Sequence, residues 1–233
     1  MRADRSEIDI GMVSKAYARW APIYDLVFGA VFDAGRKASI AAAERVGGRI
    51  LDVGIGTGIS LSDYSPTSTV VGVDYSEPML RKARARVDTQ RLGHVQALAV
   101  MDAQRLGFAD AAFDAVVAQY VITTVPDPEA VLDELARVTR PGGEIILVNH
   151  LGAEGGLRRI MEQAVGPLAC RLGWRTEFRW ERLARWARRH GGVRLLERRV
   201  MPPFGHFSLV RWQRADHGGQ MTDDGRDDTL SDI

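Results

Sequence analysis

The central part of the chain alternates short apolar runs with longer amphipathic stretches. Five apolar runs are typical of buried strands, and they cover residues 50–53, 69–74, 95–100, 113–118 and 144–148. Helical patterns separate several of these runs, as over residues 128–139. Strands that alternate with helices predict right-handed crossovers and a parallel sheet, and therefore an α/β fold. Residues 193–200 and 206–214 are expected to add two closing strands.

The N-terminal segment has a helical pattern of its own. From Met12 to Val31 apolar positions recur at helical spacing, and Pro22 interrupts them, which predicts two helical pieces with a kink. A further helix is predicted from Asp33 to Val46, where a Gly-Gly pair ends it. We expect residues 1–46 to form a helical cover that serves as a substrate gate or membrane contact.

Composition adds limits to this picture. The charged content of 26% is ordinary for a soluble globular protein, and no apolar stretch is long enough to span a bilayer. The single cysteine excludes an internal disulfide, and no Cys/His cluster has the spacing of a metal site, so no metal is expected. Residues 215–233 hold six aspartates and one arginine, so we expect a disordered acidic tail after a core over residues 47–214.

The first apolar run leads into a glycine cluster. Gly54, Gly56 and Gly58 stand on alternate positions, where they let the backbone turn sharply and approach a ligand closely. A dinucleotide fingerprint would need a glycine where the chain has Ile59, and a phosphate-binding P-loop would need a lysine that this stretch lacks. The remaining pattern, Asp-x-Gly-x-Gly-x-Gly, predicts a strand–loop–helix nucleotide site of another kind.

Polar side chains follow the other predicted strands. Asp74 ends the second strand twenty positions after Gly54, where a carboxylate can accept both hydroxyls of an adenosine ribose. Asp102 follows the third strand, where it is either a solvated turn residue or an acceptor for an adenine amino group. The fourth and fifth strands end at Gln119-Tyr120 and Asn149-His150. Because ligands of such sheets lie at the carboxyl ends of the strands, we expect these side chains to converge.

The order of these motifs resembles class I S-adenosylmethionine (SAM) methyltransferases over about residues 45–150. The resemblance rests on the series Leu51 to Gly58, Asp74, Asp102, Phe113-Asp114 and Arg140-Pro141-Gly142-Gly143. It implies a Rossmann-like, seven-stranded, mostly parallel sheet with helices on both faces and an antiparallel closing pair. It also implies SAM as the cofactor and S-adenosylhomocysteine as the product.

Motif positions carry over a set of cofactor-binding residues from the resemblance. Gly54, Gly56 and Gly58 would line the methionine part of SAM, Asp74 would bind the ribose and Asp102 the adenine. The expected set is completed by Asp52, Tyr75, Met79, Ala103, Gln119 and Tyr120.

A second resemblance concerns the methyl acceptor. Residues 17–25 resemble the N-terminal segment of bacterial phosphatidylethanolamine N-methyltransferases, which are related to quinone C-methyltransferases. The Tyr24-Asp25 pair is shared with the quinone enzymes, whereas the preceding Arg-Trp-Ala-Pro looks more like the phospholipid branch. The implied substrate-binding residues are Tyr17, Arg19, Trp20, Tyr24 and His150. Tyr24 or His150 would assist removal of a proton from the amine, and His150 is equally a packing or capping residue on sequence grounds.

The stretch between residues 158 and 189 is strongly basic. Its nine arginines are Arg158, Arg159, Arg171, Arg175, Arg179, Arg182, Arg185, Arg188 and Arg189. Because tryptophans and other apolar residues are interleaved with them, the stretch is either a solvated face over core aromatics or a surface for anionic lipid. No recognised nucleic-acid module accompanies the charge, so no nucleic acid is expected.

The two resemblances together imply a SAM-dependent phospholipid N-methyltransferase. We expect it to be cytoplasmic and peripheral on the inner face of the cytoplasmic membrane, with phosphatidylethanolamine as substrate. One alternative is a ubiquinone- or menaquinone-type or other small-molecule methyltransferase, and another is a SAM-binding adaptor without catalysis. The oligomeric state stays open, with a monomer as one option.

Overall fold

The computed structural model of the protein describes residues 32–151, 178–202 and 207–216. The kinked helical pieces predicted before residue 32 and nearly all of the expected acidic tail lie outside these ranges. So do Arg158, Arg159, Arg171 and Arg175 of the basic stretch.

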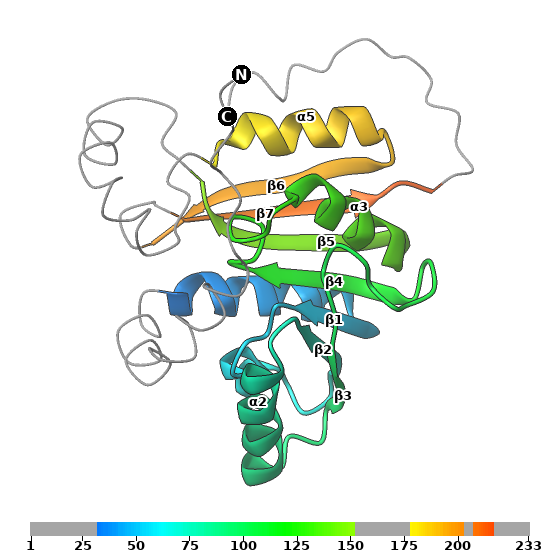
Figure 1. Cartoon of the computed structure of the whole chain (residues 1–233). Coiled ribbons are helices and arrows are strands. Elements are labelled where there is room, and N and C mark those ends of the chain that lie inside the picture. The colour runs from blue at the N-terminus through cyan, green and yellow to red at the C-terminus, as the bar shows by residue number, and fades with distance from the viewer. Residues whose placement is uncertain (1–31, 152–177, 203–206, 217–233) are drawn as a thin grey trace, which may run out of the picture.

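Within the described residues, seven strands form one sheet in the order β3-β2-β1-β4-β5-β7-β6 (Figure 1). The strands are β1 (Arg49–Val53), β2 (Thr69–Asp74), β3 (Val95–Val100), β4 (Phe113–Gln119), β5 (Thr139–His150), β6 (Val193–Met201) and β7 (Phe207–Arg214). β1 to β5 pair in parallel, whereas β7 is antiparallel to both of its neighbours. The predicted mostly parallel α/β sheet with an antiparallel closing pair is therefore confirmed.

Helices cover both faces of the sheet. The regular elements are a helix over residues 32–46, a 3₁₀ helix η1 (Ile59–Asp63), α2 (Glu77–Gln90), α3 (Pro128–Val138) and α5 (Trp180–His190). α3 and α5 pack on one face, and the helix over 32–46, η1 and α2 pack on the other (Figure 1). The central strands β1 and β4 are buried on both sides, which explains their nearly continuous apolar sequences.

The turn expected at Arg140–Gly143 lies inside β5 rather than before it. Pairing passes from Phe113–Thr139 to Ala115–Glu144, so β5 advances five positions while β4 advances two. The extra residues bulge out, with Gly142 in the left-handed region at φ 73°. Arg140 forms an ion pair with Asp114 across this bulge. The Pro-Gly-Gly sequence therefore interrupts the strand locally without ending it.

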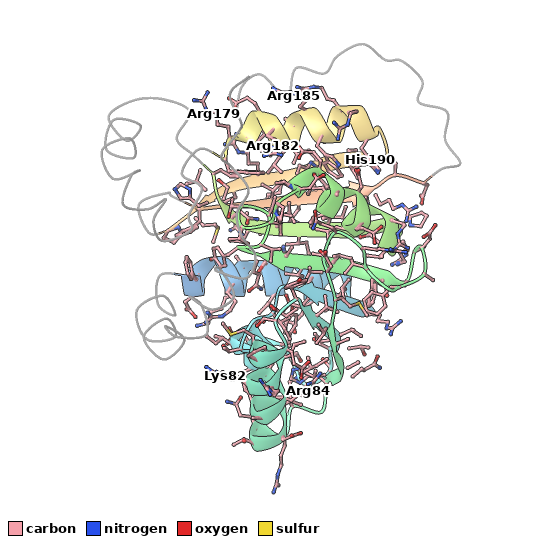
Figure 2. The ribbon with its side chains drawn as sticks, in the orientation of Figure 1. Lys82, Arg84, Arg179, Arg182, Arg185 and His190 are labelled. Atoms are coloured by element: carbon pink, nitrogen blue, oxygen red, sulfur yellow. The ribbon has the colours of Figure 1, made fainter. Side chains whose placement is uncertain are left out.

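The basic stretch enters the described structure at α5, where its aromatic residues belong to the core. Trp180 and Trp186 are 7% and 1% exposed, and the Trp186 Nε1 donates a hydrogen bond of 2.7 Å to Asp133 in α3. The exposed arginines lie away from this core, and Arg179 and Arg185 project outward (Figure 2), whereas the half-buried Arg182 reaches Glu129 in α3. For α5, the prediction that arginines and tryptophans share one lipid-facing surface is therefore wrong, because packing against the sheet buries the indoles.

A buried carboxylate joins β1 to η1 beneath the glycine loop. Asp52 is 1% exposed, and its Oδ2 accepts hydrogen bonds from Ser60 Oγ at 2.9 Å and from the Tyr64 hydroxyl at 3.2 Å. Burial raises the pKa of Asp52 from 3.8 to about 7, although the two hydrogen bonds act in the opposite direction. These bonds hold the first turn after the glycines against the strand that precedes them.

We expect the Asp52→Asn substitution to change how stability depends on pH. The raised pKa of Asp52 means that the folded state holds the proton more tightly than the unfolded state does. The contribution of Asp52 to the free energy of unfolding is therefore fully present below about pH 4, and it is lost as the pH rises to about 7. The variant should lack this decline, which amounts to about 4 kcal/mol. Urea denaturation at several pH values measures it, and parallel curves for the two proteins would contradict the prediction.

Candidate active site

The glycine loop between β1 and η1 adopts a backbone that only glycine accepts easily. Gly54, Gly56 and Gly58 have φ values of 74°, 56° and 75°. At Gly54 a Cβ would lie 2.3 Å from Val121 Cγ2, so close packing also requires a glycine there. At Gly56 a Cβ would meet nothing within 4 Å. The loop is therefore packed tightly at its start and open at its middle, which leaves room for a ligand against the backbone.

Asp74 lies beside this loop at the end of β2. Its Oδ2 accepts a hydrogen bond of 2.8 Å from the Gly56 N–H, and its Oδ1 accepts one of 2.8 Å from the Ser76 N–H. Burial raises the pKa of Asp74, against the effect of these two bonds. A carboxylate has about four lone-pair positions, so both oxygens can still accept ribose hydroxyls. The fixed carboxylate and the open glycine backbone fit the ribose and methionine parts of SAM.

The ends of β2 and β3 present apolar side chains around the expected adenine position. Tyr75 is 58% exposed and Val100 is 47% exposed, and Val100 is the register partner of Asp74. Met79 at the start of α2 and Ala103 in the turn after β3 are both half-buried. Sequence analysis missed Val100, because a valine that ends an apolar run resembles an ordinary strand residue. Its exposure at the edge is the signal that distinguishes it.

Asp102 lies in a tight turn just after β3. It is exposed, and its Oδ1 accepts a hydrogen bond of 2.9 Å from the Gln104 N–H. The Met101 N–H bonds to the Asp74 carbonyl oxygen at 3.0 Å, so the ends of β2 and β3 are held together. The turn interpretation and the adenine interpretation of Asp102 are therefore compatible, and its adenine contact stays a prediction.

The end of β4 turns toward the helix over 32–46. Tyr120 has a φ of 62°, a conformation that is uncommon for a residue with a side chain and that often occurs at functional sites. Its hydroxyl donates to the Phe32 carbonyl oxygen at 3.0 Å, and burial raises the pKa of Tyr120. The Gln119 side-chain amide donates to Ser39 Oγ at 3.0 Å. Both side chains thus have partners on the helix, and their contact with SAM stays a prediction.

An aromatic cluster stands at the carboxyl ends of β4 and β5. It consists of Phe32, Tyr120, Phe207 and His150. The Tyr120 ring centroid lies 4.2 Å from that of Phe32 and 5.4 Å from that of Phe207, and the His150 ring lies 6.2 Å from that of Phe207. Phe207 was not expected at the site, because only the antiparallel register of β7 places it opposite His150.

Of the candidate catalytic and substrate-binding residues, only one lies in the part of the chain that the structure describes. The candidate catalytic residue His150 is half-buried at the edge where the loop and Asp74 lie, whereas Tyr17, Arg19, Trp20 and Tyr24 lie outside the described residues. In the described part of the chain, no group of three or more His, Cys, Asp or Glu side chains could hold a metal ion. No described helix is long and apolar enough to cross a membrane.

Comparison with known sequences agrees with this geometry. A family profile described as "Methyltransferase domain" matches residues 51–147. Phosphatidylethanolamine N-methyltransferase from Cereibacter sphaeroides is 41% identical over 207 residues, which cover 89% of this chain and 100% of that protein. Demethylmenaquinone methyltransferase from Thermus thermophilus is 37% identical over 163 residues, which cover 65% of this chain and 73% of that protein.

Solved structures share the fold at low sequence identity. A putative methyltransferase in complex with the Haloferax volcanii Trm112 activator superposes with a TM-score of 0.71 at 19% identity, covering 89% of this chain and 100% of that one. A Haemonchus contortus phosphoethanolamine N-methyltransferase superposes with a TM-score of 0.63 at 18% identity, covering 88% of this chain and 58% of that one. The chain belongs to the class I SAM-dependent methyltransferases, in the family that includes the phosphatidylethanolamine N-methyltransferase of Cereibacter sphaeroides, and its cofactor is SAM.

Proposed function

We propose that the protein transfers methyl groups from SAM to the amine of phosphatidylethanolamine, and then to its mono- and dimethyl forms, toward phosphatidylcholine. The observation that carries this proposal is the 41% identity over the whole length of the Cereibacter sphaeroides enzyme. The Arg-Trp-Ala-Pro sequence at residues 19–22 favours the same branch. The quinone methyltransferases match a smaller part of the chain at lower identity, which makes a quinone the second candidate acceptor.

The chain's own residues would bind the cofactor and prepare the amine. SAM supplies an electrophilic methyl group on a sulfonium. The glycine loop and Asp74 would hold it at the switch point between β1 and β4, where the strand order reverses. A lipid amine is mainly protonated at neutral pH and must lose a proton before each transfer. His150 is our first candidate to accept that proton, because an imidazole ordinarily titrates near neutral pH, and Tyr24 is the second.

The aromatic cluster supports an amine acceptor more directly than a quinone. The face of an aromatic ring attracts a substituted ammonium by about 0.5–2 kcal/mol. Phe32, Tyr120 and Phe207 place three rings within 5.4 Å of one another at this edge. Tyr17, Trp20 and Tyr24 would add to them from the N-terminal segment. Such a lining would also exclude water, which makes the positioned amine a better nucleophile.

We further propose that the protein reaches its substrate by binding reversibly to anionic membrane. Three exposed arginines at α5 form no ion pair in the part of the chain that the structure describes, namely Arg179, Arg185 and Arg188. Arg182 differs from them, because its guanidinium donates hydrogen bonds of 2.7 and 2.5 Å to the two carboxylate oxygens of Glu129. The unpaired arginines are therefore the candidates for contact with lipid phosphates.

The acceptor is tested by transfer of labelled methyl groups. We expect SAM labelled on its methyl group to label phosphatidylethanolamine derivatives in a bacterial lipid extract. Label in a prenylated quinone and in no phospholipid would overturn the phospholipid proposal and support the quinone alternative. SAM binding without label in either lipid class would support the adaptor.

Asp74→Ala should weaken SAM binding severely. Two hydrogen bonds from ribose hydroxyls to a charged carboxylate would be lost, on the order of 1.5–3 kcal/mol each. Titration calorimetry measures the affinity, and the thermal midpoint without SAM shows whether the loop still folds. Unchanged SAM affinity would remove Asp74 from the site.

Exchanging Arg179 and Arg185 for glutamine should weaken binding to anionic vesicles about 10- to 30-fold, since each basic residue near such a surface contributes about 1 kcal/mol. Arg81→Gln with Lys82→Gln is the matched control. It removes the same charge from two exposed positions of α2. Figure 1 shows that α2 lies at the other end of the sheet from α5, and Figure 2 shows Lys82 there. Vesicle sedimentation measures both pairs. If both pairs of substitutions weakened vesicle binding equally, net charge rather than the surface of α5 would determine binding.

A further inference from the structure

Asn149, the second-last residue of β5, has a buried side-chain amide without a partner among the described residues. The residue is 2% exposed, and within the described structure neither its Nδ2 nor its Oδ1 has a hydrogen-bond partner. A buried amide that makes no hydrogen bond lowers stability, so such a group points to a partner that the described residues do not supply, and a bound ligand is the partner we consider.

Strand alternation places this amide on the face covered by α3 and α5. Leu147 and Leu151, two positions away on either side, both belong to the apolar cluster of that face. On β7, Ser208 is the register partner of Asn149 and is itself 5% exposed. Asn149 and Ser208 are therefore a polar pair at the rim of an otherwise apolar cluster.

The pair lies at the same edge as the cofactor loop. The Tyr120 N–H bonds to the Val148 carbonyl oxygen at 2.6 Å, which fixes the end of β4 next to Asn149. Val121, the next residue, belongs to the apolar cluster of this face and packs directly against Gly54. His150, the candidate proton acceptor, follows Asn149 and faces the opposite side of β5. The backbone beside Asn149 is thus joined to the end of β4 near the cofactor loop, whereas the amide and the aromatic cluster lie on opposite faces of β5.

We propose that Asn149 binds the methyl acceptor, with its carbonyl oxygen accepting a hydrogen bond from the acceptor's amine N–H and its amide N–H donating to an oxygen of the same headgroup. The identity of that headgroup rests on the proposed function. A neutral amide suits the task, because it orients an amine by hydrogen bonding and stabilises the ammonium form far less than a carboxylate does. A carboxylate at this position would hold the proton on the nitrogen and suppress the nucleophile.

The test replaces the amide by apolar side chains. In Asn149→Leu, the thermal midpoint should stay level or rise by about 2–4 °C, because an unsatisfied polar group is removed. Asn149→Ala covers the case in which leucine does not fit. Gln119→Leu is the stability control: it removes an amide that does have a partner in Ser39, so its midpoint should fall.

The kinetic readout compares the acceptors of successive methylations. For phosphatidylethanolamine in mixed micelles, kcat/KM should fall about 10- to 100-fold in both Asn149 variants, the factor expected for hydrogen bonds to a polar headgroup. For the dimethyl form, whose neutral amine has no N–H, the loss should be several-fold smaller. SAM affinity, measured by calorimetry, should stay within about two-fold of wild type because the substitution leaves the glycine loop intact.

Three results would overturn the inference. They are wild-type kcat/KM in both variants, equal losses for the unmethylated and dimethyl acceptors, and a midpoint in both variants that falls as far as in Gln119→Leu. The last result would mean that the amide serves the fold. The proposed function fails separately, when the wild-type protein methylates no phospholipid. The stability comparison can still be made in that case, because it needs no acceptor.

Discussion

The arrangement of the site depends on the hydrogen bond that the Gly56 N–H donates to the Asp74 carboxylate. The other residues of the site lie around this connection. It joins the glycine loop after β1 to the end of β2, and the second Asp74 oxygen holds the backbone that starts α2. Because β1 lies next to β4 at the switch point, the same loop also contacts Val121 beyond β4. One fixed carboxylate therefore sets the position of a loop that three strands share.

Beneath this edge the protein is almost wholly apolar, and its few buried polar groups differ in how they are satisfied. Asp52 is bonded by Ser60 and Tyr64, so it stabilises the turn from β1 into η1. Asn149 has no such partner among the described residues, although it is buried nearly as deeply. A satisfied buried group is explained by the fold alone, whereas an unsatisfied one needs a further reason.

The α5 helix shows how packing decides between two interpretations of one sequence. Arginines interleaved with tryptophans fit a lipid surface and fit a solvated helix equally well in sequence. The structure buries Trp180 and Trp186 against β7, pairs Arg182 with Glu129 and leaves the other arginines of α5 outside. Any attraction of α5 for a membrane must then be electrostatic, and salt would weaken it.

The sequence by itself determined the parallel sheet, the glycine loop and the carboxylate of Asp74. Apolar runs, glycine spacing and residues at strand ends are local patterns, and local patterns predict elements and their order. Only the tertiary structure decided that Phe207 faces His150, that Tyr120 turns toward Phe32, and that the amide of Asn149 has no partner among the described residues. These facts depend on strand register and on contacts between segments far apart in the chain, which no single stretch of sequence specifies.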